Sequence, residues 1–353
     1  MGGLSSKINA LERAIGNLKS SYDAASSQKR LEDLWPAVTA GDISVLKEYG
    51  KLENRLGEYN ELKGDAEFLI DYAKDVEATA NQTDAAVTSK EMTNCLLRMR
   101  DFILEQKFTE KDDDRNAIIS FQIHQGWDQM TQYMEDLRTA YRKFAEKKGF
   151  QIEYVDVGDS RECTIRVSGE YSYAFFRGEN GLHKFYYISD NTTGHSSAKK
   201  THTGSLTVRV RPEVEMPSVE LKKEDLEISH LAASTPGGSN ANTSNTGVRI
   251  THKPTGITVT SRMRSQHRNL ELAREILIYR VAERLENTVK KDVRSLWGHF
   301  VRTYKLATER IISDNQTGMK TYDIESFFNG EIEDYILAYH GISFEIPKNG
   351  NGK

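Results

Sequence analysis

The sequence of 353 residues predicts an α+β protein with an N-terminal helical bundle, a β-rich middle region and a small α/β domain carrying an exposed Gly-Gly loop. Three observations predict this arrangement. Apolar residues recur at helical spacing in the N-terminal third, and the spacing changes to near-alternation after Gly149. A polar segment around Gly237 and Gly238 then separates two strand-like runs. Because the chain is too long for one ordinary hydrophobic core, we expect several compact units.

The N-terminal third carries three helical runs. The first apolar stripe consists of Leu4, Ile8, Leu11, Ile15 and Leu18. A second stripe begins at Tyr49 and is interrupted by Gly57 and Gly64, which favours a long helix with weak points over a regular coiled coil. The third run covers about 89–108. We expect these runs to form an antiparallel bundle or hairpin over residues 1–112, ending in a charge cluster typical of a linker.

The middle region changes from a helical to a strand-like pattern. A helix is predicted over about 127–148, with Gly149 as its C-terminal stop. Alternation and β-branched or aromatic residues predict strands at 152–157, 163–167, 171–188 and 205–211. The residues Glu179-Asn180-Gly181 are expected to form a tight turn between two strands. The polar stretch 190–204 is expected to be a functional surface loop.

The remaining elements surround a second polar segment. Residues 232–246 read AASTPGGSNANTSNT and contain no apolar side to bury, which predicts an exposed loop. LEISHL before it and VRITH after it predict flanking strands, and KPTGITVTS predicts a further strand pair. A basic helix is expected from about 269 to 297, and a short helix over about 320–340.

Charge is distributed unevenly along the chain. Residues 236–312 contain fourteen Lys and Arg against six Asp and Glu, a net charge of +8. Residues 1–120 contain sixteen against twenty-two, a net charge of −6. A basic block beside an acidic one is typical of a protein that meets a polyanion with one region, although a solvated helix face gives the same pattern.

Several function classes find no support in the sequence. Cys95 and Cys163 show no CxxC spacing and suggest buried thiols in a reducing compartment. The sequence shows no recognisable signal peptide and no membrane-spanning apolar stretch. We find no nucleotide-binding glycine loop, metal-ligand cluster or Ser-His-Asp arrangement. We therefore expect a cytoplasmic protein without metal or cofactor.

Three long motifs resemble one protein family. The run VRITHKPTGITVTSRMRSQHRN, with two strands, a Pro-Thr-Gly turn and a helix start, closely resembles the catalytic domain of bacterial-type class I peptide chain release factors. GEYSYAFFRGENGLHKF and VRTYKLATERIISDNQTG resemble the same family, and the similarity covers about 125–340. It is nearest to the subtype that reads UGA and UAA. The implied division is 1–112 helical bundle, 113–222 decoding-type domain, 223–308 catalytic-type domain, and 309–353 returning to the decoding superdomain.

The resemblance implies a catalytic tip that departs from the family. Gly237, Gly238 and Ser239 align with the Gly-Gly-Gln that enters the peptidyl transferase centre and promotes hydrolysis of the peptidyl-tRNA ester. In the family, the backbone N–H at the third position is thought to stabilise developing negative charge, as an oxyanion-hole donor does. Ser239 keeps this N–H but replaces a long amide with a short hydroxyl. Impaired hydrolysis is therefore expected.

The resemblance also implies a codon-recognition site and an RNA-binding face. Ser189, Asp190 and Asn191 align with the Ser-Pro-Phe tripeptide, of which only the serine is kept. His202 and Thr203 match a His-Thr pair that contacts codon bases in the family, and an imidazole suits stacking on unpaired RNA bases. The expected RNA-phosphate contacts are Arg249, Lys253, Arg262, Arg264, His267 and Arg268.

Three functions remain open from the sequence. The first is a divergent release factor homologue that binds the ribosomal A site and hydrolyses poorly, with ribosomal RNA, the mRNA stop codon and peptidyl-tRNA as partners. A translational GTPase is left open as a further partner. The second is a functional release factor with a Gly-Gly-Ser tip, and the third is an RNA-binding protein that uses the fold away from ribosomes. Peptide release and ribosome co-sedimentation distinguish the three.

Overall fold

The chain divides into two compact units. The computed structural model describes residues 2–79, 82–156, 161–188, 201–213, 221–231, 246–262, 265–289, 300–307 and 309–347. Unit 1 comprises Met1–Thr109 together with His340–Lys353, and unit 2 comprises Glu110–Tyr339. The expected middle and catalytic-type domains thus lie together in unit 2.

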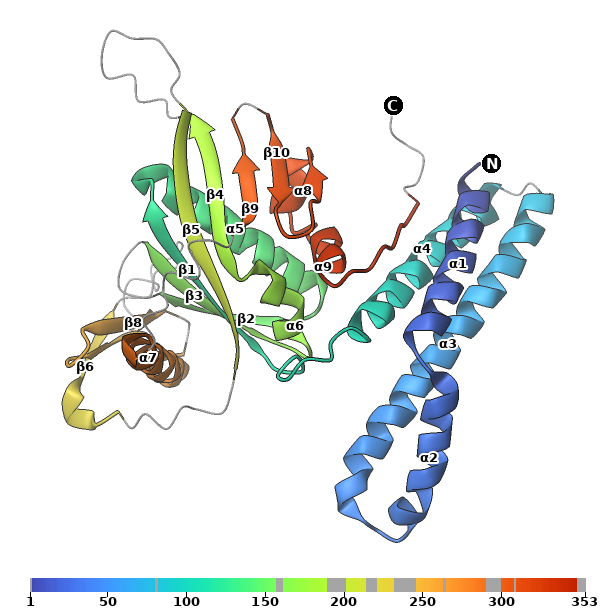
Figure 1. Cartoon of the computed structure of the whole chain (residues 1–353), viewed down its shortest axis with the longest axis horizontal. Coiled ribbons are helices and arrows are strands. Elements are labelled where there is room, and N and C mark those ends of the chain that lie inside the picture. The colour runs from blue at the N-terminus through green and yellow to red at the C-terminus, as the bar shows by residue number, and fades with distance from the viewer. Residues whose placement is uncertain are drawn as a thin grey trace. The chain divides into compact units, whose positions relative to one another are not determined.

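Unit 1 is a helical bundle. Its helices are α1 (Gly2–Ser21), α2 (Ala24–Thr39), α3 (Ile43–Thr79) and α4 (Gln82–Glu105). Helices α1, α3 and α4 pack along one another, and Leu11, Leu62 and Leu96 in their shared core have no exposed surface (Figure 1). Helix α3 continues through Gly57 and Gly64, so the expected long helix is confirmed. Packing of its apolar stripe outweighs the low helix propensity of two glycines.

Helix α2 was not predicted from the sequence. Its stripe is short, because Leu31 and Leu34 are the buried residues that face α3. The Asp23 carboxylate accepts a hydrogen bond from the Ser26 backbone N–H at 3.0 Å and caps the first turn. This capping residue is the local signal that could have predicted the helix start.

The described residues of unit 2 contain one eleven-stranded sheet. Its strands are β1 (Ala117–Gln125), β2 (Gln151–Asp156), β3 (Glu162–Ser168), β4 (Gly181–Ile188), β5 (Thr201–Pro212), β6 (Leu226–Leu231), β7 (Gly247–His252), β8 (Ile257–Ser261), β9 (Phe300–Lys305), β10 (Ile311–Asp314) and β11 (Lys320–Thr321). Their order is β11-β10-β9-β4-β5-β1-β3-β2-β8-β7-β6. The described neighbours are antiparallel except β4 and β9, which are parallel.

Helix α5 (Trp127–Lys147) packs across β1, β2 and β5 (Figure 1). The expected helix over about 127–148 is confirmed, and its residues Met130, Leu137, Tyr141 and Phe144 are fully buried. Gly149 follows with φ +75, a left-handed backbone conformation that glycine adopts readily.

The first half of the expected strand over 171–188 is helical instead. Helix α6 (Ser172–Phe176) and the 3₁₀ turn η1 (Arg177–Glu179) precede β4, so the Glu179-Asn180-Gly181 turn joins a helical segment to a strand. A strand would direct Phe175 and Phe176 to opposite faces. In the structure both rings contact Phe144 of α5, at centroid distances of 6.0 and 5.5 Å.

Two further expectations are corrected. Strand β5 begins at Thr201, so the end of the expected loop 190–204 is part of the sheet. The expected helix over 320–340 is divided into α8 (Ile324–Phe328) and α9 (Glu333–Tyr339). Gly330 between them has φ +87, and a Cβ atom there would lie 2.8 Å from the Phe144 backbone N, so the chain turns where it meets α5.

A separate helix covers the β8-β7-β6 edge of the sheet in unit 2. Helix α7 (Gln266–Val289) packs on β7 and β8, and Val248, Ile250 and Leu272 are fully buried between them. The expected strands at LEISHL and VRITH are confirmed as β6 and β7. The strand pair expected in KPTGITVTS is instead a turn followed by the single strand β8, and α7 begins three residues before the expected start. Among the described residues, the pair Asp156 and Thr260 joins β8 to β2.

The expected C-terminal segment 309–353 is divided between the two units. Strands β10 and β11 and helices α8 and α9 belong to unit 2. Ile342, Phe344 and Ile346 pack instead against the core of the helical bundle in unit 1. These inward residues alternate with exposed ones, which is the pattern of an extended segment lying on an apolar surface.

Candidate functional site

His202 and Thr203 lie at the start of β5, beside the end of β4. In the antiparallel register His202 is opposite Tyr187, and Thr203 is opposite Tyr186. Successive residues of a strand point to opposite faces, so the two candidate codon contacts do not share a face. The His202 imidazole stacks on the Tyr187 ring at 5.8 Å between centroids and 21° between planes. Both candidate residues are half-buried.

The N-terminus of α5 approaches this strand end closely. Gly126 has φ +90, and a Cβ atom on it would lie 2.8 Å from the Tyr187 hydroxyl oxygen and 3.2 Å from the Gly204 Cα. A Cβ atom on Gly204 would collide with the Met130 sulfur and lie 3.1 Å from the Gln125 carbonyl oxygen. Only glycine at both positions lets α5 and β5 come this close.

His124 lies on β1 near the same end of the sheet. Its Nε2 is 2.7 Å from the Thr207 hydroxyl of β5. Partial burial, together with the neighbouring Arg209 guanidinium, lowers the pKa of His124 from its ordinary value. The sequence offered no role for this residue, and its contact to β5 indicates a structural one.

The expected tripeptide Ser189, Asp190 and Asn191 lies outside the described residues. The same holds for the tip residues Gly237, Gly238 and Ser239 and for Arg264. Of these calls, the structure describes only the segments that flank them.

Strand pairing brings together the residues that flank the candidate tip segment, residues 232–245. Leu231, the last residue of β6, is opposite Gly247, the first residue of β7. A Cβ atom on Gly247 would lie 3.0 Å from the Leu231 carbonyl oxygen and 3.4 Å from the Arg262 Cγ. Leu231 and Thr246, which flank residues 232–245, therefore lie at neighbouring points beside the end of β8 and the start of α7.

Asn269 fixes this point, and sequence reasoning did not single it out. Its side chain is fully buried, donates a hydrogen bond to the Thr246 carbonyl at 2.7 Å and accepts one from the Ser261 hydroxyl at 2.8 Å. One amide thereby joins α7 to the ends of β7 and β8. The available signal was an asparagine three residues before Leu272, in line with the apolar stripe of the helix.

The described members of the expected RNA-binding set do not form a single cluster. Arg262 and His267 are exposed near the tip segment, whereas Lys253 is exposed at the β7–β8 turn, at the opposite end of that hairpin. Arg249 is half-buried, and its Nε donates to the Thr260 hydroxyl at 3.3 Å. Arg268 belongs to an ion-pair network inside unit 2.

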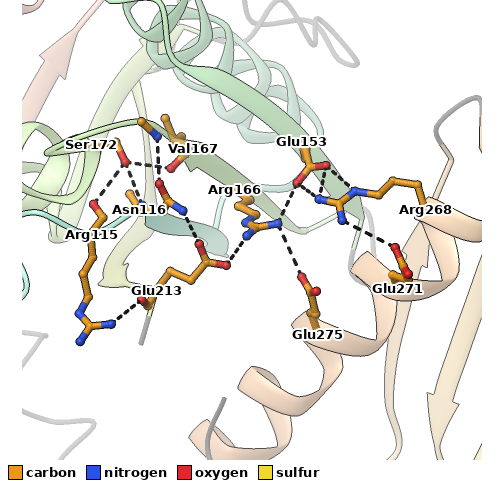
Figure 2. A network of polar contacts seen from close by, with 12 residues as sticks. Arg115, Asn116, Glu153, Arg166, Val167, Ser172, Glu213, Arg268, Glu271 and Glu275 are labelled. Atoms are coloured by element: carbon orange, nitrogen blue, oxygen red, sulfur yellow. Dashed lines mark hydrogen bonds and ion pairs between the residues drawn. The ribbon is translucent and has the colours of Figure 1, made fainter. Parts of the chain in front are cut away.

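Figure 2 shows this network between α7 and the sheet. The Arg268 guanidinium donates to both carboxylate oxygens of Glu153 on β2, at 2.8 to 3.0 Å. Arg166 on β3 pairs with Glu153 at 3.1 Å, with Glu213 at 2.7 Å and with Glu275 of α7 at 3.6 Å. Arg268 is thus engaged by a carboxylate, and RNA would have to compete for it.

No group of three or more His, Cys, Asp or Glu in the described ranges has an arrangement that could hold a metal ion. Within the same ranges, no helix is long and apolar enough to cross a membrane.

Comparisons with known proteins agree along most of the chain. A PCRF domain matches residues 18–208, more than half of the chain, and an RF-1 domain matches residues 212–316. The chain is 31% identical over 325 residues to peptide chain release factor 2 of Thermomicrobium roseum, covering 87% of this chain and 84% of that protein. It is 27% identical over 359 residues to the protein of that name from Chloroflexus aggregans, covering 95% and 97%. The structure of RF2 of Thermus thermophilus matches with a TM-score of 0.59 and 27% identity, covering 93% of this chain and 98% of that one.

The chain belongs to the bacterial class I peptide chain release factor family. As a release factor, it acts in translation termination at the ribosome. The candidate codon residues Ser189–Asn191, His202 and Thr203 lie within the matched PCRF range. The candidate tip Gly237–Ser239 lies within the matched RF-1 range. The two candidate sites of this release factor therefore fall in two different family domains.

Proposed function

We propose that the chain is a divergent release factor that occupies the ribosomal A site in termination or its modulation, with impaired hydrolysis of peptidyl-tRNA. Ser239 carries this proposal, because it follows Gly237-Gly238 where the resemblance expects glutamine. The proposal rests on that alignment and on the described elements around the segment.

The chemistry of Ser239 supports slower hydrolysis of peptidyl-tRNA rather than a different reaction. Its backbone N–H is retained, so one donor for the developing oxyanion remains. Its hydroxyl is too short to replace the amide that helps admit water and exclude larger nucleophiles in the family. Removal of one well-placed side-chain donor costs on the order of 10²–10³ in rate in other enzymes. Because Ser239 lacks the amide donor of the glutamine side chain, we expect a loss of hydrolysis rate of this size.

The scaffold of the tip supports retained binding. Asn269 holds the ends of β7 and β8 on α7, and β6 and β7 pair over their whole length. The exposed Arg262 guanidinium lies beside Gly247 and can contact phosphate, and the exposed His267 imidazole lies at the start of α7. Binding and hydrolysis therefore depend on different residues, and the second can weaken without the first.

The codon-recognition part of the proposal rests on His202 and Thr203, at the start of β5. In the expected tripeptide, Ser189 matches the family, whereas Asp190 and Asn191 do not. Peptide release on each of the three stop codons therefore identifies the codons that are read. We propose the cytoplasm as the place of action, with ribosomal RNA, mRNA and peptidyl-tRNA as partners and a translational GTPase as a further candidate.

Peptide release tests this function directly. Ribosomes carrying labelled peptidyl-tRNA and one of the three stop codons are mixed with saturating protein, and the single-turnover release rate is measured. We expect the parent to release slowly and Ser239→Gln to be faster by on the order of 10²-fold, with an unchanged half-saturating concentration. Ser244→Gln places the same amide in the same segment away from the tip and should not change the rate.

The result separates the three functions. Release by the parent at the rate of a Gly-Gly-Gln release factor would show a fully functional factor and overturn the impairment. Absence of ribosome co-sedimentation, with RNA binding retained, would instead favour a role away from the ribosome. Slow release with firm ribosome association supports the proposal.

A further inference from the structure

The Tyr187 ring contacts both Tyr133 of α5 and His202 of β5. Its ring centroid is 5.6 Å from that of Tyr133 and 5.8 Å from that of His202. Tyr133 in turn stacks on Phe185, with 5.3 Å between ring centroids and 11° between ring planes. Phe185 stacks on Tyr304, with 4.2 Å and 3°. A row of rings thus extends from the buried sheet to the imidazole at the start of β5.

The Tyr187 ring has little freedom to turn. It is 7% exposed, and its hydroxyl lies against Gly126, where an added Cβ atom would be 2.8 Å away. The β4–β5 ladder holds its backbone opposite that of His202. His202 is half-buried, with one face on this fixed ring. The orientation of the imidazole is therefore set by Tyr187 as well as by its own strand.

We propose that Tyr187 is a positioning residue, which holds the His202 imidazole at a fixed angle so that it can stack on an unpaired base of the mRNA. This inference rests on the proposed codon-recognition role of His202. Stacking of a base on an aromatic side chain contributes substantially to single-strand binding. A ring already held in its bound orientation loses less conformational freedom on binding.

The geometry assigns the effect to the face of the Tyr187 ring rather than to its hydroxyl. The hydroxyl is directed to Gly126, whereas the contact with His202 is between nearly parallel rings. Phenylalanine should therefore replace Tyr187 without loss, and leucine should not. This pair of substitutions separates ring stacking from general packing, because both keep an apolar side chain at the position.

The first measurement uses the free protein. Histidine ring signals are observed by NMR with ¹³Cε1-labelled histidine, and the His202 signal is assigned by its loss in His202→Gln. A stacked tyrosine shifts this signal through its ring current. We expect Tyr187→Phe to keep the shift and Tyr187→Leu to abolish it, while Tyr154→Leu, which removes a half-buried tyrosine elsewhere against α5, leaves it unchanged.

The second measurement uses ribosomes with a stop codon in the A site. Tyr187→Leu should raise the half-saturating protein concentration roughly three- to tenfold without changing maximal occupancy, and Tyr187→Phe should leave it unchanged. In a His202→Gln background, Tyr187→Leu should have no further effect, because the two residues act as one unit. An equal effect in both backgrounds would show mere destabilisation and overturn the positioning role.

The outcomes also separate this inference from the proposed function. If His202→Gln weakens stop-codon binding and Tyr187→Leu alone does not, the positioning role fails and the codon role of His202 stands. If His202→Gln leaves stop-codon binding unchanged, the codon role fails and this inference fails with it. A ring-current shift that survives Tyr187→Leu overturns the positioning role independently of any ribosome.

Discussion

Single buried polar residues hold the strands of unit 2 in register. Arg302 on β9 is fully buried and binds Glu179 through two hydrogen bonds of 2.7 and 2.8 Å, and Asp314 at 3.0 Å. His183 on β4 lies beside this group. Its Nε2 is 3.0 Å from the Glu179 carbonyl, which can only accept, so Nε2 carries the proton and Nδ1 accepts from the Tyr304 hydroxyl at 3.0 Å. Both ring nitrogens are satisfied by the neutral form.

His183 makes the stability of unit 2 depend on pH. Burial lowers its pKa from 6.5 to about 4. Between these values the unfolded chain binds a proton that the folded chain does not, so the contribution is complete above pH 6.5 and is lost as pH falls toward 4. We expect a loss of about 3 kcal/mol over this window. His183→Gln should remove this part of the pH dependence.

Urea unfolding at several pH values measures this change in the free energy of unfolding. Hydrogen exchange of the β4 and β9 amides at the same pH values localises it to unit 2. His267→Gln is the control, because its ring is exposed, and it should keep the parental pH profile within about 0.5 kcal/mol. A parental profile that stays flat between pH 6.5 and 4 would contradict the assignment.

At the scale of elements, the start of α5 approaches the sheet closely. Gly126 combines a left-handed backbone with close contacts to Tyr187, Met130 and Gly204. Gly149, after the same helix, has a similar φ of +75 but no heavy atom within 4 Å of an added Cβ atom. A side chain at Gly149 would therefore cause backbone strain alone, whereas a side chain at Gly126 would cause strain and steric crowding.

Alanine at these positions should give different losses of stability. Gly149→Ala introduces strain alone and should cost about 1–2 kcal/mol. Gly126→Ala adds crowding against a packed aromatic side chain and should cost about 1–3 kcal/mol more. Denaturant unfolding of both variants measures the difference. Equal losses would mean that Tyr187 and Met130 move aside freely, and would weaken the case for a fixed Tyr187 ring.

At the scale of the whole molecule, residues 342–346 pack on the helical bundle that the N-terminal residues form in unit 1. Ile342, Phe344 and Ile346 cover the core of the helical bundle, and Arg13 lies 3.9 Å from Glu345. The exposed ion pair adds little, so the apolar contacts account for the attachment. An open groove of about 290 Å³ lies between α1 and residues 343–345.

Removal of one apolar contact should loosen the helical unit selectively. Phe344→Ala should lower the protection of α1 amides from hydrogen exchange by about 1–3 kcal/mol, because its ring is half-buried on the bundle. Protection in β1 and β5 should not change. Ser343→Ala, an exposed neighbour, is the matched control. Equal loss of protection in α1 and β1 would show that the two units unfold together.

The sequence by itself determined the elements whose signals are local. The stripes of α1, α3 and α5 repeat at helical spacing, and β6, β7 and β8 alternate around recognisable turns. The motif beginning at Val248 was long enough to indicate the release factor family, which the comparisons show. It also defined Gly237–Ser239 as the candidate tip. Such patterns are short-range consequences of backbone geometry, so no distant residue is needed to read them.

Tertiary structure alone decided which residues far apart in the chain meet. Phe175 and Phe176 read as alternating strand residues, yet a shared contact with Phe144 places them in a helix. Arg268 belonged to a basic run, but Glu153, more than a hundred residues earlier, binds it. Pairing and burial depend on partners brought together by the whole fold, and a local pattern contains no information about them.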